Sequence, residues 1–138
     1  MRVQIRGKAQ DLVVGSAPPD EHNCLIASIT HALLAAGVRV TMEAPAVRKE
    51  LQVTFDGAQA MAFLALERHG PAILQVLCRG QCLASGFTLA CIHVRKASAV
   101  PQAVLSGGNV VGSGPKVLYM ANECNLHFVP LLPRQLES

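Results

Sequence analysis

The chain has 138 residues, of which 51% are hydrophobic and 15% are charged, and its mean hydropathy is positive. This composition excludes a disordered protein and is typical of a chain that folds around one core, so we expect a single domain over residues 1–138. The net charge is only +3 without a basic stripe, and no apolar run reaches the roughly 18 to 20 residues that span a bilayer, so we expect neither a nucleic acid nor a membrane as a partner.

The N-terminus and the cysteines indicate a protein of the cytosol. The first residues, MRVQIRGKAQD, lack the continuous apolar segment of a signal peptide. Five unevenly spaced cysteines argue against a disulfide framework, which uses an even number of them. We therefore expect a cytoplasmic protein with free thiols.

The first predicted elements are a short strand over residues 3–6 and a loop over residues 16–20, in which Pro18 and Pro19 prevent a regular element. A helix is then expected from Asn23 or Cys24 as far as Gly37. Its apolar residues recur at three- and four-residue steps, at positions 25, 26, 29, 32, 33 and 36.

Two more helices are expected before the middle of the chain. One covers residues 47–53, after Pro45, and a buried one covers residues 58–69, where Gly70 and Pro71 end it. Residues 72–77 are apolar and fit either a helix or a strand.

The second half predicts strands. Residues 87–94 are apolar on both alternating faces, as in an interior strand, and two further strands fit residues 116–121 and 126–131, separated by a polar turn. The Gly-rich stretch 106–114 is expected to form a hairpin loop or a mobile flap. Helices first and strands later predict an α+β fold, with an N-terminal helical part packed on a small C-terminal β-sheet.

Cys24 is placed where a loop rich in Pro and Asp becomes the first turn of an amphipathic helix. Unpaired backbone N–H groups and the positive end of the helix dipole favour a thiolate at such a position, and the same N–H groups can stabilise an oxyanion. The thiolate is the nucleophilic form of cysteine, so this placement suits covalent catalysis. A buried structural cysteine is the alternative interpretation.

His127 opens the last predicted strand. Strand alternation places Asn125, His127 and Val129 on one face, with Leu126 and Phe128 on the other. A histidine at the start of an apolar strand can point from the edge of a sheet into a cleft, where it would serve as a general base.

The segment Asp20-Glu21-His22-Asn23-Cys24-Leu25 resembles the nucleophile motif of the ovarian-tumour (OTU) family of cysteine proteases, which have a papain-like fold. Three later segments are similar to core strands of that family in the same order: Ile92-His93-Val94, Lys116-Val117-Leu118-Tyr119, and His127-Phe128-Val129-Pro130-Leu131. The resemblance spans nearly the whole chain. It implies Cys24 as nucleophile and His127 as its base.

The resemblance further implies a deubiquitinase, which cleaves the peptide or isopeptide bond after the C-terminal glycines of ubiquitin or a ubiquitin-like modifier. Backbone groups of Glu21 and Cys24 would hold the oxyanion, and neither a metal nor another cofactor is required. A compact domain of this type is similar to those of viral polyproteins and bacterial effectors, which act in the host cytoplasm. Two alternatives remain, a papain-like peptidase that processes a polyprotein and a non-catalytic ubiquitin-binding module of the same fold.

The sequence departs from the OTU pattern two residues after the histidine. Many members have Asp or Asn there to orient the imidazole, but this chain has Val129, which cannot accept a hydrogen bond. Asn125 and Asp11 are the candidates for a third residue, and a simple dyad of Cys24 and His127 is the other interpretation.

The remaining cysteines form no standard zinc pattern. We interpret these four cysteines as buried thiols, and we expect no metal even though His93 lies near one of them in sequence. The cysteines are Cys78, Cys82, Cys91 and Cys124.

Overall fold

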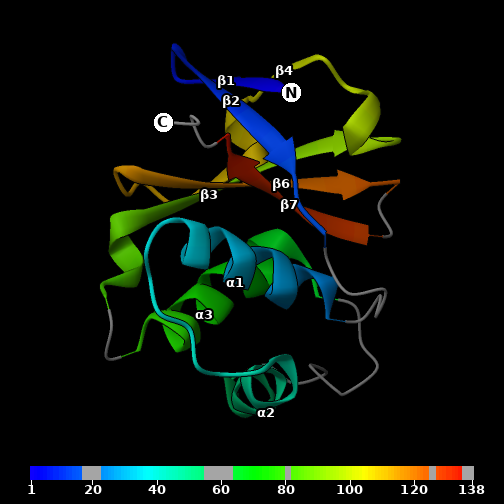
Figure 1. Cartoon of the computed structure of the whole chain (residues 1–138). Coiled ribbons are helices and arrows are strands. Elements are labelled where there is room, and N and C mark those ends of the chain that lie inside the picture. The colour runs from blue at the N-terminus through cyan, green and yellow to red at the C-terminus, as the bar shows by residue number, and fades with distance from the viewer. Residues whose placement is uncertain (17–22, 55–63, 80–81, 125–126, 135–138) are drawn as a thin grey trace.

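The computed structural model describes residues 1–16, 23–54, 64–79, 82–124 and 127–134. Within these ranges the chain forms three α-helices and one curled sheet of seven strands, which confirms the α+β class (Figure 1). The helices are α1 (Cys24–Ala35), α2 (Ala44–Thr54) and α3 (Leu66–Cys78). The strands are β1 (Arg2–Ile5), β2 (Lys8–Val14), β3 (Phe87–Val94), β4 (Gln102–Val104), β5 (Val110–Val111), β6 (Lys116–Glu123) and β7 (His127–Pro133).

The strand order is β4-β1-β2-β7-β6-β3-β5, and the sheet is mixed because β3 runs parallel to β6 and β1 runs parallel to β4. Short 3₁₀ turns interrupt the connections: η1 (Ala84–Gly86), η2 (Ala97–Ala99) and η3 (Gly107–Asn109). None of the helices in the described ranges has both the length and the apolar composition needed to cross a membrane.

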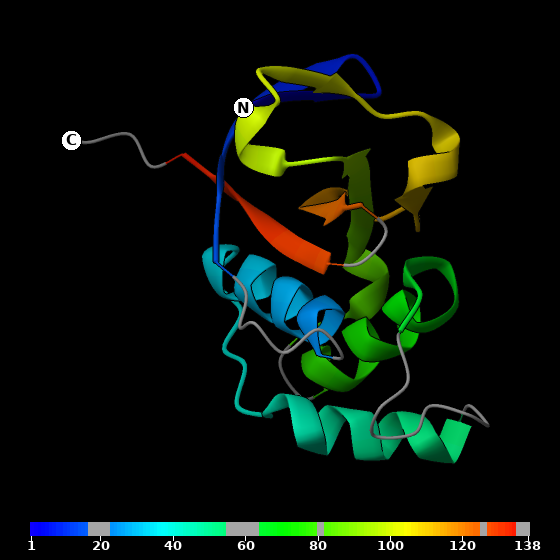
Figure 2. The same cartoon turned by 90° about the vertical axis from the view of Figure 1, so that its right-hand side faces the viewer.

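Two apolar clusters lie on opposite faces of the central strands β7, β6 and β3. Alternate residues point to opposite faces of a strand, so Leu118 and Met120 of β6 pack against the helices, whereas Tyr119 and Ala121 pack on the other side. Helices α1 and α3 cover the first face, and α2 lies beyond them (Figures 1 and 2). Strands β1 and β4, with part of β2, fold over the second face.

Strand β2 makes the sheet curl. Its first half pairs with β1 up to Asp11, and its second half pairs with β7 from Leu12 opposite Pro133 to Val14 opposite Leu131. This strand has no signal in the sequence, because Leu12 is its one buried residue and no alternation is visible. The sheet therefore takes two strands from the N-terminus, and the expectation that it is C-terminal was wrong in this respect.

Helix α1 matches its prediction, and Gly37 follows it with a φ of +86°, a conformation that favours glycine. Helix α2 covers the predicted residues 47–53 but begins earlier, with Pro45 in its first turn, where a missing N–H costs nothing.

The predicted end of the third helix, at residue 69, was wrong. Residues 58–63 lie outside the described part, and the described helix α3 begins at Leu66 and continues through Gly70 and Pro71 to Cys78. Burial of α3 side chains such as Ile73 and Leu74 outweighs the cost of proline inside a helix, about 3 kcal/mol. A Cβ at Gly70 would stand 2.9 Å from Leu89 Cδ1, so glycine permits the close packing of α3 on β3.

The three C-terminal strand predictions are confirmed, as β3, β6 and β7. The stretch 106–114, expected to be a hairpin loop or a flap, contains η3 and the edge strand β5. Strand β5 pairs with β3 through Val110 opposite Ala90 and Val111 opposite Leu89.

Gly114 should be essential to this edge of the sheet. Its carbonyl oxygen accepts a hydrogen bond from Thr88 Oγ1 at 2.8 Å, and a Cβ added to it would overlap the backbone of Gly86 and Phe87. We expect Gly114→Ala to lower the free energy of unfolding by at least about 2 kcal/mol in urea titrations, because backbone atoms cannot rotate away as side chains do. Gly108→Ala is the matched control, since its nearest neighbour would be Ser106 Oγ at 3.9 Å; equal stability of the two variants would contradict this account.

Candidate active site

Cys24 is the first residue of α1 and is 4% exposed. The apolar face of α1, formed by Leu25, Ile29 and Leu33, packs in the core beneath β6 and β7 and thereby fixes where the helix begins. The first amides of a helix have no partner within the helix, and they surround the Cys24 backbone. The predicted start of this helix, at Asn23 or Cys24, is therefore confirmed.

The sulfur of Cys24 accepts a hydrogen bond from the backbone N–H of Phe128 in β7, with an N to Sγ distance of 3.3 Å. The pairing of β7 with β2 explains why this amide is available. Strand β2 ends at Val14, and the last bond along that edge runs from Gly15 N–H to Pro130 O at 2.8 Å. The next amide that points to the same side of β7 is that of Phe128, because antiparallel strands alternate the direction of their N–H groups.

The structure thus places Cys24 beside the start of β7, where His127 is located. The Cα of His127 is two bonds from the Phe128 nitrogen, so it lies no farther than about 6 Å from the sulfur. Because side chains alternate between the two faces of a strand, half-buried His127 lies on the same face of β7 as Val129, which is the face away from the helices. To reach the sulfur, the ring must take the staggered side-chain conformation that leans toward the α1 edge of β7.

Asn23, the N-cap residue of α1, does not cap its own helix through its side chain. Its Oδ1 instead accepts a hydrogen bond from Nε of Arg48 in α2, at 2.9 Å. Arg48 is only 4% exposed, which is unusual for arginine. A buried guanidinium in the outermost helix therefore holds the residue that precedes Cys24.

His69 of α3 lies in the same region. Its Nδ1 accepts a hydrogen bond from the backbone N–H of Ala65, the N-cap residue of α3, at 2.9 Å. Burial lowers the pKa of His69 below its ordinary value of 6.5, and the nearby charges of Arg68 and Arg48 lower it further. His69 is therefore neutral near pH 7.

The other predicted site residues have different outcomes. Glu21 and Asn125 lie outside the described residues. Asp11 is on β2, and its carbonyl oxygen accepts a hydrogen bond from the backbone N–H of Arg134, at the opposite end of β7 from His127. Six residues of strand separate those ends by about 20 Å, so the structure does not bring Asp11 to Cys24.

The thiols of Cys78 and Cys91 are poor nucleophiles. Burial raises the pKa of Cys91 to about 12, and burial together with a hydrogen bond to Cys82 raises the pKa of Cys78 to about 12. Both thiols stay protonated at neutral pH, in agreement with their interpretation as buried thiols. Cys124, by contrast, is exposed at a turn. In the described part of the chain, no three His, Cys, Asp or Glu side chains are grouped to hold a metal.

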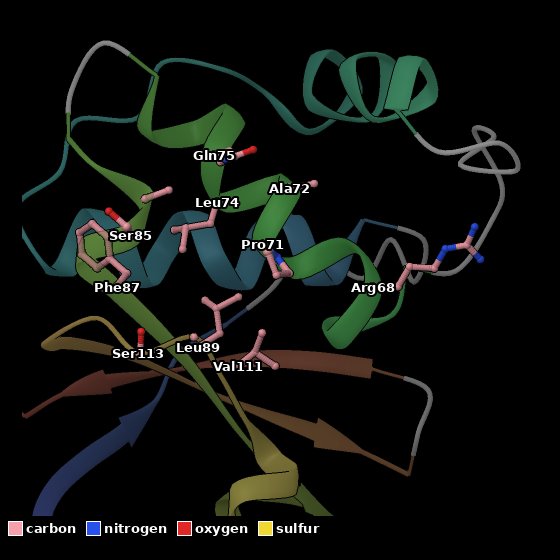
Figure 3. A pocket seen from close by; sticks show the side chains of 12 residues that line it. Arg68, Pro71, Ala72, Leu74, Gln75, Ser85, Phe87, Leu89, Val111 and Ser113 are labelled. Atoms are coloured by element: carbon pink, nitrogen blue, oxygen red, sulfur yellow. The ribbon is translucent and has the colours of Figure 1, made fainter.

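A pocket of about 490 Å³ lies elsewhere, between α3 and the edge of the sheet (Figure 3). Leu74, Phe87, Leu89 and Val111 give it an apolar floor, and Arg68 stands at one end. Neither Cys24 nor His127 lines it.

No family model, curated protein or solved structure matches this chain. A thiol at a helix N-terminus, a backbone amide aimed at the sulfur and a histidine within side-chain reach together make an arrangement that can support nucleophilic catalysis.

Arg48 and His69 were not predicted as parts of this region. Arg48 appears in the sequence as half of a basic pair, Arg48-Lys49, which is the usual appearance of a solvated helix face. Its burial depends on the packing of α2 against α1 and α3, for which the sequence carries no separate signal.

We expect Arg48→Met to destabilise the protein by about 1 to 3 kcal/mol, because it removes the hydrogen bond that Arg48 Nε donates to Asn23 Oδ1. Arg48→Lys should recover part of the loss, since an ammonium group can donate but cannot reproduce the geometry of a guanidinium. Urea unfolding measures both effects. The control is Lys49→Met at the neighbouring exposed position, and identical midpoints for the two Met variants would contradict the assignment.

Because the pKa of His69 is lowered in the folded protein, we expect the free energy of unfolding to depend on pH. Below about pH 6.5 the unfolded chain takes up a proton at this histidine, whereas the folded protein does not, because its pKa is lowered. The free energy of unfolding should therefore fall as the pH decreases from 7.5 to 5.5. His69→Gln should reduce this fall in urea titrations at the two pH values, whereas His31→Gln, at an exposed position of α1, should not.

Proposed function

We propose that the protein is a thiol hydrolase in which Cys24 attacks a carbonyl carbon and His127 acts as its base. The single observation that carries the proposal is the hydrogen bond from Phe128 N–H to Cys24 Sγ, which joins the N-terminus of α1 to the first residues of β7. The other two buried thiols differ from it: Cys78 is the last residue of α3, Cys91 lies inside β3, and burial raises the pKa of both.

In the proposed reaction His127 accepts the proton of the Cys24 thiol, and the thiolate attacks the carbonyl carbon of an amide. The imidazolium returns the proton to the departing amine as the C–N bond breaks, which leaves a thioester on Cys24. Water, deprotonated by His127, then hydrolyses the thioester, releases a carboxylate and restores the thiol. Backbone N–H groups of the first turn of α1 stabilise the oxyanion in both steps.

The proposal requires the substrate to reach a sulfur that is nearly buried, since Cys24 is 4% exposed. The hydrogen bond from Phe128 must lengthen or break when a carbonyl carbon approaches. We therefore propose that substrate binding uncovers the nucleophile, so that small thiol reagents react slowly compared with a bound substrate.

The proposed substrate is the amide after the C-terminal glycines of ubiquitin or a ubiquitin-like modifier. This part rests on the resemblance of the segment from Asp20 to Leu25 and of the last strand to the OTU family. Two glycines have no side chains, so such a tail fits a narrow approach to a recessed sulfur.

The second candidate function is a non-catalytic module that binds the modifier. The burial of Cys24 and the apolar side chain of Val129, which cannot orient the imidazole, favour it. It predicts binding without turnover.

A ubiquitin whose C-terminal glycine is replaced by propargylamine, so that an alkyne stands where the carboxylate was, tests the first proposal. We expect the wild type to form a covalent adduct at Cys24, which mass spectrometry locates. Cys24→Ala should form none, and His127→Ala should react at least about 100-fold more slowly, as is usual when a general base is removed.

Cys124→Ala is the matched control and should react as the wild type does, because its thiol lies in a turn near β6 and is not needed. An adduct that persists in Cys24→Ala would contradict the proposal. Binding of ubiquitin without any adduct would favour the non-catalytic module, and cleavage of an unrelated peptide without reaction with ubiquitin would favour a polyprotein-processing peptidase.

A further inference from the structure

The face of the sheet that carries His127 needs a hydrogen-bond acceptor if this histidine is to be a base. One ring nitrogen must face the sulfur, and a partner on the other nitrogen fixes the tautomer and the ring orientation. Val129, on the same face of β7, is 6% exposed and belongs to the apolar cluster, so its side chain offers no acceptor.

Glu123 of β6 lies directly opposite His127 in the antiparallel pairing of β6 and β7. Both residues are on the face away from the helices, since Ala121 and Val129, two positions along each strand, belong to the apolar cluster of that face. Directly opposed residues have Cβ atoms about 4.5 to 5.5 Å apart, a separation that side chains of this length can bridge.

The carboxylate of Glu123 is already held in place. Its Oε2 accepts a hydrogen bond from the backbone N–H of Ala97 in η2, at 2.8 Å, and the residue is half-buried. A carboxylate has two oxygens with several acceptor positions, so Oε1 can serve a second donor. An anchored carboxylate loses less side-chain entropy than a mobile one when it binds a further group.

We propose that Glu123 is the positioning residue that orients His127, and that it takes the place of the Asp or Asn which this chain lacks at position 129. Glu123 Oε1 accepts the N–H of the imidazole nitrogen that faces away from Cys24 and stabilises the imidazolium formed when the thiol loses its proton. The inference rests on the proposed hydrolase function.

Asn122 is the neighbouring alternative, and the fold argues against it. It pairs with Phe128 and therefore lies on the helix side of β6, opposite to the face of Glu123. Its Oδ1 is buried and makes no hydrogen bond. Substitution of Asn122 therefore removes no bond and provides a control next to Glu123.

The experiment compares Glu123→Gln, Glu123→Asp, Glu123→Ala and Asn122→Ala in the full chain, after circular dichroism shows that each is folded. Steady-state cleavage of a fluorogenic amide of the ubiquitin tail gives kcat and KM. We expect Glu123→Ala and Glu123→Gln to lower kcat by at least about 10-fold with little change in KM, because the loss concerns proton transfer and not substrate binding. Glu123→Asp should recover part of the rate, and Asn122→Ala should match the wild type.

A second readout does not depend on turnover. The nitrogen chemical shifts of the His127 ring, measured by NMR, report which nitrogen carries the proton, and Glu123→Ala should change this tautomer balance while Asn122→Ala does not. Unchanged ring shifts in Glu123→Ala would overturn the inference, as would a normal kcat. A wild type with no hydrolase activity but with the expected change in ring shifts would instead refute the proposed function alone.

Discussion

The hydrogen bond between the Phe128 amide and the Cys24 sulfur is the constraint on which the arrangement of the site depends. A backbone N–H inside a protein needs an acceptor, and β2 ends before it can supply one to this part of β7. The sulfur at the start of α1 fills that position. Since the apolar face of α1 rests on the core, the helix is fixed both by its burial and by this contact at its end.

Most of the elements could be predicted from the sequence because their apolar residues have a clear period. Helix α1 repeats at three- and four-residue steps, and β3 is apolar on both faces. Strand β2 was missed for the opposite reason, because six of its seven residues are exposed and pairing with two neighbours, not burial, makes it a strand. The end of α3 was misplaced because Gly70 and Pro71 are local signals for a break, and tertiary packing of the following residues overrode them.

The candidate site, like the fold, could be predicted from the sequence only in part. The order of Cys24 and His127 along the chain, one at a helix start and one at a strand start, was visible in the sequence. The partners of these residues were not. Arg48 is in a helix whose charged residues look solvated. Glu123 lies in the polar segment after residue 121 that predicts a turn, but β6 extends through it and pairs it with His127. Such partners are set by strand register and by helix packing, which depend on contacts between segments far apart in sequence.

The sulfur acceptor also links the chemical state of Cys24 to the backbone of β7. Oxidation or acylation of the sulfur changes the charge and the shape of the only acceptor that the described residues provide for the Phe128 N–H. The backbone amide of residue 128 is thus an intrinsic reporter group, whose proton resonance and rate of deuterium uptake register each modification of the thiol without any added label.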